Sequence, residues 1–278
     1  MRRALNQSRF TEVRVTEGQI WGTLSESPYD PFDLYERGVA PHLAFANAKD
    51  IKKWHEDYGP LFDFTGAYSS SVEAFLGAQR RFVAVMGLWQ AWKGGRKDIG
   101  ECFVRAVKET DYVSLPGRRE YKWVGGDMLF ITPRTKGHKH DPRLGKLVEI
   151  DGKQPHEAAE DFSRTAPRQE LRLAAEDLLK HSLAVRLEGV QPAFSDKQGF
   201  EPTWIIQDFL QACYMMLFFD MTKRRGIRNC AECGQFFYPS AKRPRCCSKE
   251  CARRSRQRRY WKRRGKKLRK KRMEEDRP

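Results

Sequence analysis

The chain has 278 residues, of which 40% are hydrophobic and 12% aromatic, and it carries a net charge of +17 at pH 7. This composition supplies a sizeable core and excludes a chain that is disordered throughout. The most apolar window, Phe209–Phe219, has 11 residues between two aspartates, whereas a membrane span needs about 20. No apolar segment follows the arginines near the start, so we expect no signal peptide and a cytoplasmic protein without a membrane partner.

The positive charge is concentrated at one end of the sequence. Residues 223–278 hold 23 Lys and Arg against 5 Asp and Glu, a net charge of +18, while residues 1–222 have a net charge of −1. Such an asymmetry is typical of proteins that bind a polyanion. Five of the seven cysteines lie in the same basic segment. In a reducing compartment, clustered cysteines indicate a metal site before disulfides.

The first part of the chain mixes a hairpin with helices. Val13–Leu24 predicts two short strands around Glu17-Gly18. Asn47–Leu61 predicts a short helix that stops at Gly59-Pro60. The clearest helical pattern covers Ser70–Gly95, where apolar residues recur at helical spacing.

Two signals mark the ends of the helix over residues 70–95. Ser70 and Glu73 have the spacing of a capping box, in which each side chain bonds a free backbone N–H group at the helix start. Gly94-Gly95 predicts the end of the helix, because glycine is common just after the last helical residue.

The middle of the chain is rich in turns. Gly125-Gly126 and Asp151-Gly152 each predict a turn between short strands, and Pro133–Pro142 predicts an exposed loop. His138 and His140 lie in that loop. We expect no metal or nuclease site there, because two solvated histidines do not make the closed ligand set that a metal requires.

Helices return before the basic segment. Trp204–Lys223 predicts a buried apolar helix, and Gly189–Pro202 predicts a β segment before it. An earlier helix has these residues on one face: Leu171, Ala174, Ala175, Leu178 and Val185. The sequence therefore predicts an α+β domain over residues 1–225, mainly helical with short hairpins.

The cysteines after residue 225 form two close pairs. Cys230 and Cys233 are separated by two residues, which is the spacing of a metal-binding knuckle. Cys247 and Cys251 are four residues apart, so one helix presents both on the same face, with Ser248 as its N-cap. Four thiolates favour one tetrahedral zinc ion, and they leave no open position for catalysis, so we expect a structural site. Cys246 is left out, because it cannot share this geometry with its neighbour Cys247.

A strongly basic segment follows the last cysteine of the site. Of the 21 residues from Ala252 to Arg272, 14 are basic and none is acidic. A solvated helix face normally alternates in charge, so an unbroken positive face indicates a bound polyanion, with nucleic acid as the first choice over acidic membrane or protein. The nucleic-acid-binding residues predicted from this pattern are Arg253, Arg254, Arg256, Arg258, Arg259, Tyr260, Lys262, Arg263 and Arg264.

Helical spacing divides the basic segment into two faces. Cys251, Ser255 and Arg258 fall on the side of the metal, while Arg253 and Arg256 fall on the opposite side with Lys249, Tyr260, Arg263 and Arg264. Tyr260 and Trp261 stack on unpaired bases in one interpretation and pack against Phe236 and Phe237 in the other, which we favour. We expect Gly265 to end the helix, so that residues 226–265 form the finger and residues 266–278 a flexible basic tail.

The segment from Arg228 to Arg263 resembles the CGNR-type zinc finger found at the C-terminus of bacterial transcription regulators. The matching residues are Cys230, Cys233, Gly234, Phe237, Cys247, Ser248, Cys251 and the arginine-rich helix. The chain has Cys-Ala-Arg-Arg at 251–254 where the family name spells Cys-Gly-Asn-Arg. The residues before the finger resemble the end of an ABATE-type, stress-induced regulator domain. The resemblance implies a treble-clef-like finger, DNA binding and a regulatory role.

We therefore expect a zinc-dependent protein that binds double-stranded DNA through its finger and basic helix and regulates transcription. The domain over residues 1–225 would sense a small-molecule effector or self-associate. Two alternatives stay open: an RNA- or ribosome-associated binding protein, and a nucleic-acid-acting enzyme docked by the finger. The sequence has no phosphate-binding loop, nucleophile elbow or His-Glu-x-x-His motif, so we expect no enzyme and no catalytic residues.

Overall fold

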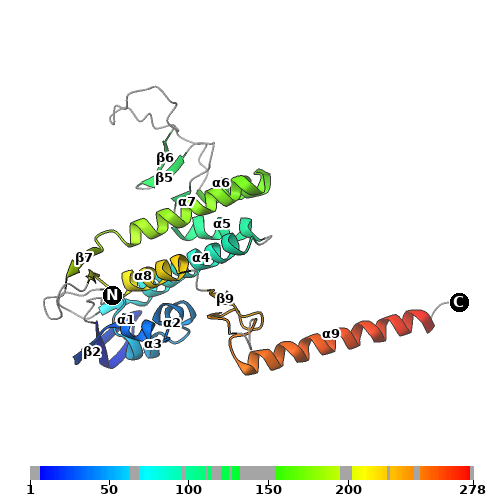
Figure 1. Cartoon of the computed structure of the whole chain (residues 1–278), viewed down its shortest axis with the longest axis horizontal. Coiled ribbons are helices and arrows are strands. Elements are labelled where there is room, and N and C mark those ends of the chain that lie inside the picture. Colours follow the sequence, from blue (N-terminus) through cyan, green and yellow to red (C-terminus); the bar gives the residue numbers. More distant parts are fainter. Residues whose placement is uncertain are drawn as a thin grey trace. The chain divides into compact units, whose positions relative to one another are not determined.

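The computed structural model describes residues 7–62, 69–95, 98–110, 112–113, 120–124, 127–131, 155–194, 202–223, 226–240 and 245–275 (Figure 1). The chain divides into two compact units, Met1–Phe218 and Phe219–Pro278. The expected loop over 133–142 with its two histidines, and the expected turn at Asp151-Gly152, lie outside the described residues. None of the helices in the described ranges is both long enough and apolar enough to cross a membrane.

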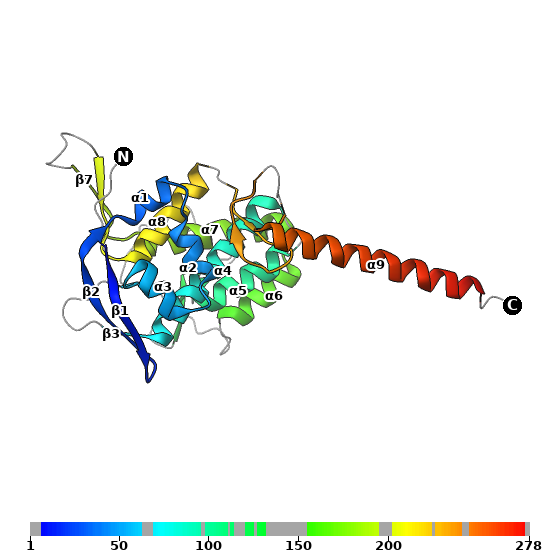
Figure 2. The same cartoon turned by 90° about the horizontal axis from the view of Figure 1, so that it is seen from below.

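A long antiparallel hairpin opens the first unit. β1 (Gln7–Thr16) pairs with β2 (Gln19–Tyr29), whose other edge pairs with the short β3 (Ser69–Ser71) (Figure 2). Glu17 and Gly18 form the two-residue turn, with φ angles of 51° and 75°. Two positive φ angles are what a type I′ turn requires, and its twist matches that of paired strands. The predicted hairpin is confirmed, and it extends beyond residues 13–24 at both ends.

Helices form most of the first unit. They are α1 (Pro31–Glu36), α2 (Pro41–Asn47), α3 (Ile51–Tyr58), α4 (Val72–Gly94), α5 (Ile99–Thr110), α6 (Pro155–Thr165), α7 (Arg168–Arg186) and α8 (Phe209–Thr222), which crosses into the second unit. Two further small sheets are antiparallel. They are made of β4 (Tyr112–Val113), β5 (Glu120–Val124) and β6 (Asp127–Ile131), and of β7 (Gln191–Phe194) and β8 (Pro202–Ile205). The strands expected on either side of Gly125-Gly126 are therefore present.

The core of the first unit is built around α4 and α8. Successive residues of α4 such as Val85 and Met86 are fully inaccessible, and residues 212–217 of α8 are all buried. A helix that is apolar on every side must lie inside a protein, as the sequence predicts for α8. The two helices meet where Phe82 and Tyr214 pack edge to face, with ring centroids 5.0 Å apart.

Several helix ends match the expected signals. α3 ends at Gly59, which has a φ of 77°, and α4 ends at Gly95, whose φ of 55° is left-handed. The start of α4 differs from the prediction. The N-cap is Ser71, whose Oγ accepts from the Ala74 N–H group at 2.9 Å. Ser70 lies in β3, where it pairs with Ile20, so it cannot form the expected capping box.

Two other expectations for the helices need correction. Val185 does not share the buried face of α7, because its side chain is 51% exposed near the end of that helix. α8 begins at Phe209 and not at Trp204, because Trp204 pairs with Pro192 in the β7–β8 hairpin. The carboxylate of Asp208 accepts from the Gln211 N–H group at 2.6 Å and so caps the start of α8.

The second unit joins the end of α8 to a small two-stranded ribbon and a long helix. β9 (Arg228–Asn229) pairs antiparallel with β10 (Phe236–Phe237), and α9 spans Lys249–Glu275. The Tyr238 hydroxyl donates to the fully buried carboxylate of Asp220 on α8. This bond ties the end of α8 to the segment that follows β10.

The helix α9 is longer than predicted. It continues through Gly265 to Glu275, so the expected flexible tail over residues 266–278 is wrong for the residues up to 275. A glycine costs a helix about 1 kcal/mol, which is too little to end a helix flanked by Lys, Arg and Leu, all of which favour helix. The helix is about 40 Å long at a rise of 1.5 Å per residue.

Candidate metal centre and basic helix

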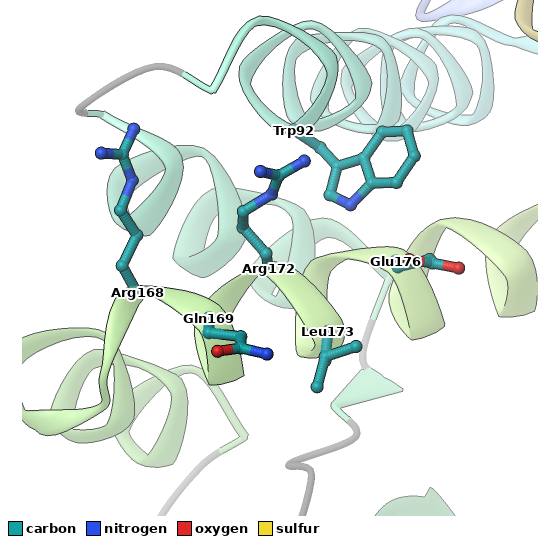
Figure 3. Close-up of a pocket in the computed structure, with 6 residues that line it drawn as sticks. All are labelled: Trp92, Arg168, Gln169, Arg172, Leu173 and Glu176. Carbon is teal, nitrogen blue, oxygen red and sulfur yellow. The ribbon is translucent and has the colours of Figure 1, made fainter.

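An open cavity of about 690 Å³ lies between the C-terminal part of α4 and the start of α7 (Figure 3). Arg172 places its guanidinium over the Trp92 ring, 5.9 Å from the centroid, and Arg168 donates to the Gly95 carbonyl. The remaining described residues that line it are Gln169, Leu173 and Glu176. This is a candidate place for the expected effector, but its only described carboxylate is Glu176, and none of its described residues forms a nucleophile–base pair.

The first cysteine pair lies on a tight turn between β9 and β10. The Cys230 N–H group donates to the Gln235 carbonyl at 2.8 Å, and the Gly234 N–H group donates to the Cys230 carbonyl at 2.9 Å. Gly234 has a φ of 73°, a conformation that costs glycine little and other residues more. The turn brings the side chains of Cys230 and Cys233 to the same side of the ribbon.

The second cysteine pair is positioned by the start of α9. Ser248 is the N-cap, because its Oγ accepts from the Cys251 N–H group at 3.1 Å. Cys247 immediately precedes the cap and Cys251 lies in the first turn. A bond from the Ala231 N–H group to the Arg245 carbonyl, 3.0 Å long, holds the two cysteine-bearing segments together.

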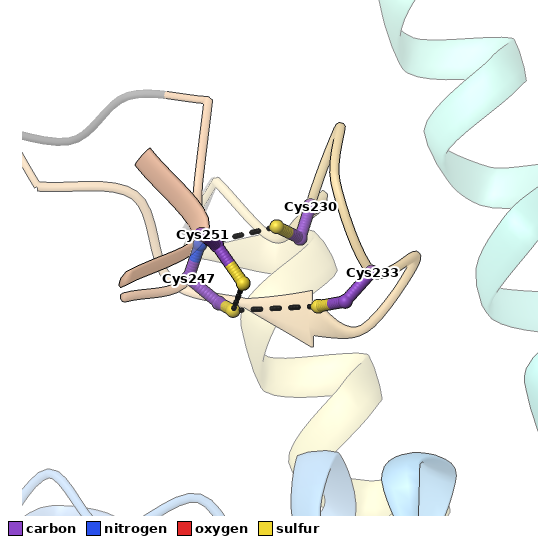
Figure 4. A group of neighbouring side chains, drawn as sticks. All are labelled: Cys230, Cys233, Cys247 and Cys251. Carbon is purple, nitrogen blue, oxygen red and sulfur yellow. Dashed lines mark hydrogen bonds between the residues drawn. The ribbon is translucent and has the colours of Figure 1, made fainter. Parts of the chain in front are cut away.

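The four sulfurs form a compact cluster (Figure 4). All lie within 4.8 Å of one another, with Cys233 Sγ 3.5 Å from Cys247 Sγ and Cys247 Sγ 3.6 Å from Cys251 Sγ. All four cysteines are free. Four sulfurs about 2.3 Å from a tetrahedral zinc ion lie about 3.8 Å from one another. The cluster is therefore close enough to hold a metal ion, and its two shortest sulfur–sulfur distances are near those of a four-thiolate site.

The surroundings of the sulfurs favour thiolates at one position and oppose them at another. Burial raises the pKa of the Cys230 thiol, but hydrogen bonds from the backbone N–H groups of Cys247, Cys233 and Glu232 lower it by more. The resulting pKa is about 6. The Cys247 N–H group lies 3.4 Å from that sulfur. Burial and the adjacent sulfurs raise the pKa of Cys247 to about 12. A divalent cation removes this opposition, because a thiol that coordinates a metal is deprotonated.

The remaining cysteine of the segment, Cys246, packs beside the cluster but is not part of it. Its side chain is buried with those of Cys230 and Cys251, yet its sulfur is not in the group that can hold a metal. Burial is the main cause that raises its pKa, followed by the nearby sulfurs of the cluster. The choice of Cys247 over Cys246 agrees with this grouping.

One acidic residue connects the first cysteine pair to α9. Glu232 lies between Cys230 and Cys233, its side chain is only 8% exposed, and its Oε1 accepts from the Arg258 guanidinium at 2.7 Å. This ion pair is not among the expectations drawn from the sequence. The available signal was that Glu232 is the only acidic residue between positions 221 and 249, which makes it the natural partner for a cation on the metal side of the helix.

The nine predicted nucleic-acid-binding residues are all exposed on α9, but they differ in their partners. Arg254 is paired with Glu250 and Arg258 with Glu232. Arg253, Arg256, Lys262 and Arg263 have no acidic partner within the described part of the chain. The cations without partners include those expected on the face opposite the metal.

The two aromatic residues of α9 do not pack on the finger. Tyr260 is 57% and Trp261 56% exposed, so the expectation that they pack against Phe236 and Phe237 is wrong. Their rings contact each other at nearly right angles, with centroids 5.4 Å apart, and the Arg264 guanidinium lies over Trp261 at 5.6 Å.

No protein-family profile, curated protein or solved structure matches the chain.

Proposed function

We propose that this protein is a zinc-dependent, sequence-reading DNA-binding protein that regulates transcription. The second unit binds double-stranded DNA through α9, and the first unit receives a small-molecule signal. The proposal agrees with the resemblance of the cysteine segment to the CGNR-type finger. The observation on which it rests most directly is the separation of the cations on α9 into two sets, those paired with acids and those that have no acidic partner among the described residues.

The metal has a structural role in this proposal. Four thiolates complete the coordination of one zinc ion, so no position remains for a substrate or a reacting water. Cys247 and Cys251 lie at the start of α9, and Cys230 and Cys233 lie on the ribbon, so an ion among them fixes the direction of the helix relative to the finger. The ion pair between Glu232 and Arg258 adds a second constraint on rotation about the helix axis.

The basic side chains on the face opposite the cysteines are the proposed phosphate-binding groups. Arg253 and Arg256 lie one turn apart on the face opposite the cysteines, and Arg263 and Arg264 continue that face. Two and a half helical turns fit into a DNA major groove. This face of the helix has no acidic residue, so its arginine side chains repel one another in solution. Bound phosphates relieve that repulsion.

The test is DNA affinity measured at several salt concentrations. If about six phosphates are neutralised, log K falls with log salt with a slope of about −5. Replacing Arg253 and Arg256 by alanine lowers the magnitude of the slope by about one to two units, because two phosphate contacts are lost. The zinc content does not change, since both side chains point away from the sulfurs.

A matched control removes two exposed arginines elsewhere. Arg14 and Arg164 are each paired with a glutamate in the first unit, so their double alanine variant has the same charge change without loss of the proposed face. We expect its slope to equal that of the parent. If the two double variants have the same slope, or if the parent does not bind duplex DNA, the proposed role of α9 is wrong.

A further inference from the structure

The exposed ring pair on α9, formed by Tyr260 and Trp261, is not explained by phosphate binding. Each ring is more than half exposed, although large aromatic side chains usually bury most of their surface or lie at interfaces. Phosphates interact with cations and hydrogen-bond donors and gain little from an aromatic ring. The ring pair therefore indicates a second chemical component in whatever binds this helix.

The position of Tyr260 places this ring within the proposed phosphate-binding face, and Trp261 lies beside it at the edge of that face. Tyr260 is four residues after Arg256 and four before Arg264, so these three side chains share one side of the helix. The Arg264 guanidinium lies over the Trp261 ring at 5.6 Å. Cations beside exposed rings form the arrangement that binds single strands, in which the cations hold the backbone and the rings stack on the bases.

We propose that the ring pair stacks on an unpaired base, so that α9 prefers a DNA duplex that carries a short single-stranded segment over a fully paired duplex. This inference rests on the proposed function, because the cations of α9 must first hold the nucleic acid. Bases inside a duplex are stacked on both faces and offer no free surface to a ring. An unpaired base beside the duplex offers its whole face, and such contacts are tolerant of sequence.

The experiment compares three DNA ligands with the full-length, zinc-loaded protein. One is a blunt duplex, one carries a short thymidine overhang, and one carries an overhang of the same length made of abasic nucleotides. The last two have equal numbers of phosphates and differ only in the presence of bases. We expect the thymidine overhang to bind about tenfold more tightly than the abasic overhang, within the range for one stacked base.

The variants separate stacking from charge. The Tyr260→Ala/Trp261→Ala double variant keeps the helix, since alanine has the highest helix propensity. It should lose the preference for thymidine over abasic overhangs, so that the ratio of these two affinities falls from about ten to about one. The variant Tyr260→Phe/Trp261→Phe should retain most of the preference. Trp21→Ala removes a 45% exposed tryptophan from the hairpin of the first unit and should bind as the parent does.

The outcomes distinguish the inference from the proposed function. Equal affinity for the thymidine and abasic overhangs in the parent overturns the stacking inference and leaves duplex binding intact. A double variant that loses affinity for all three ligands equally also overturns it, because the rings then support the helix and do not contact bases. Failure of the parent to bind any of the three ligands overturns the proposed function itself.

Discussion

At the scale of single residues, the second unit depends on a few side chains with little hydrophobic support. Its buried cluster consists of Cys230, Cys246 and Cys251, with Phe237, Cys247 and Ala252 partly buried against them. The sulfur atoms that lie close enough to hold a metal thus also form much of the packed interior. A change at one cysteine therefore affects the metal and the packing together, and the two effects are separable only where neighbouring cysteines differ in role.

Cys246 and Cys247 provide that separation. Replacing Cys247 by serine removes one of four sulfurs from the cluster, so we expect the zinc content to fall from one to near zero per chain after dialysis. Replacing Cys246 by serine should leave one zinc per chain and cost about 1–3 kcal/mol of stability, because a hydroxyl replaces a thiol in a buried site. Metal analysis of both purified variants makes the comparison. The opposite pattern would identify Cys246 as the ligand.

His55 makes the stability of the first unit depend on pH. Its side chain is 1% exposed and packs on Trp54 and Phe75. Burial lowers its pKa from 6.5 to about 4, and a hydrogen bond to the Ile51 carbonyl offsets only part of this effect. The unfolded chain therefore binds a proton more readily than the folded chain between pH 6.5 and 4. Stability is unaffected by this group above pH 6.5 and decreases as the pH falls through that window.

The variant His55→Gln tests this pH dependence. A difference of about 2.5 pKa units corresponds to about 3 kcal/mol, so the parent should lose up to that amount between pH 6.5 and 4 in excess of the variant. The variant itself should be less stable at neutral pH, because it loses ring contacts. Urea unfolding at several pH values, followed by tryptophan fluorescence, measures both. Parallel curves for parent and variant would show that His55 already ionises in the folded state.

At the scale of elements, the parts that the sequence predicts are those set by local rules. The turn at Glu17-Gly18 needs two positive φ angles, and a glycine in second place is the usual signal for them. α8 has an unbroken apolar run from Ala212 to Phe219, and α4 has a long periodic pattern. α1 and α2 were missed because six or seven residues give too little periodicity, although each begins with the proline that is common at a helix start.

Two other features of the structure, a helix and an ion pair, were not predicted from the sequence, and the reasons differ. α5 was missed although Ile99, Phe103, Ala106 and Val107 are buried at helical spacing, so its signal was present in the sequence. The ion pair between Glu232 and Arg258 joins residues 26 positions apart, and no local rule gives that distance. The spacing of the four cysteines predicts their grouping because each pair is local, and only the meeting of the two pairs depends on the fold.

The N-cap of α4 can be assigned by comparing substitutions at two adjacent serines, Ser70 and Ser71. Ser71→Ala removes the side chain that accepts from the Ala74 N–H group, which should cost about 1 kcal/mol, the usual effect of losing an N-cap. Ser70→Ala changes a residue of β3 that pairs with Ile20 through its backbone and should cost much less. Thermal unfolding of the two variants decides between them. A larger loss at Ser70 would mean that the cap lies one residue earlier.

At the scale of the whole molecule, the two units are stabilised by different means. The first, Met1–Phe218, has a core of large side chains such as Phe45, Phe82 and Phe103, all fully buried. The second contains few buried aliphatic residues, and a segment this small seldom folds on apolar burial alone. Binding of zinc to four thiolates contributes on the order of 10–16 kcal/mol in finger peptides, so under the proposed function we expect the metal to be the main source of stability for this unit.

Removal of the metal should therefore unfold one unit and leave the other folded. With a strong chelator, backbone amides of the ribbon and the first turns of α9 should exchange with deuterium at once, while those of α4 should keep their protection. The reason is that no described side chain of the first unit belongs to the four-sulfur group. Hydrogen exchange read by mass spectrometry resolves the segments, and Cys247→Ser without chelator should reproduce the pattern. Unchanged exchange at Cys230–Cys251 after complete loss of zinc would show that the second unit folds without the metal, and loss of protection in α4 would show that the two units unfold together.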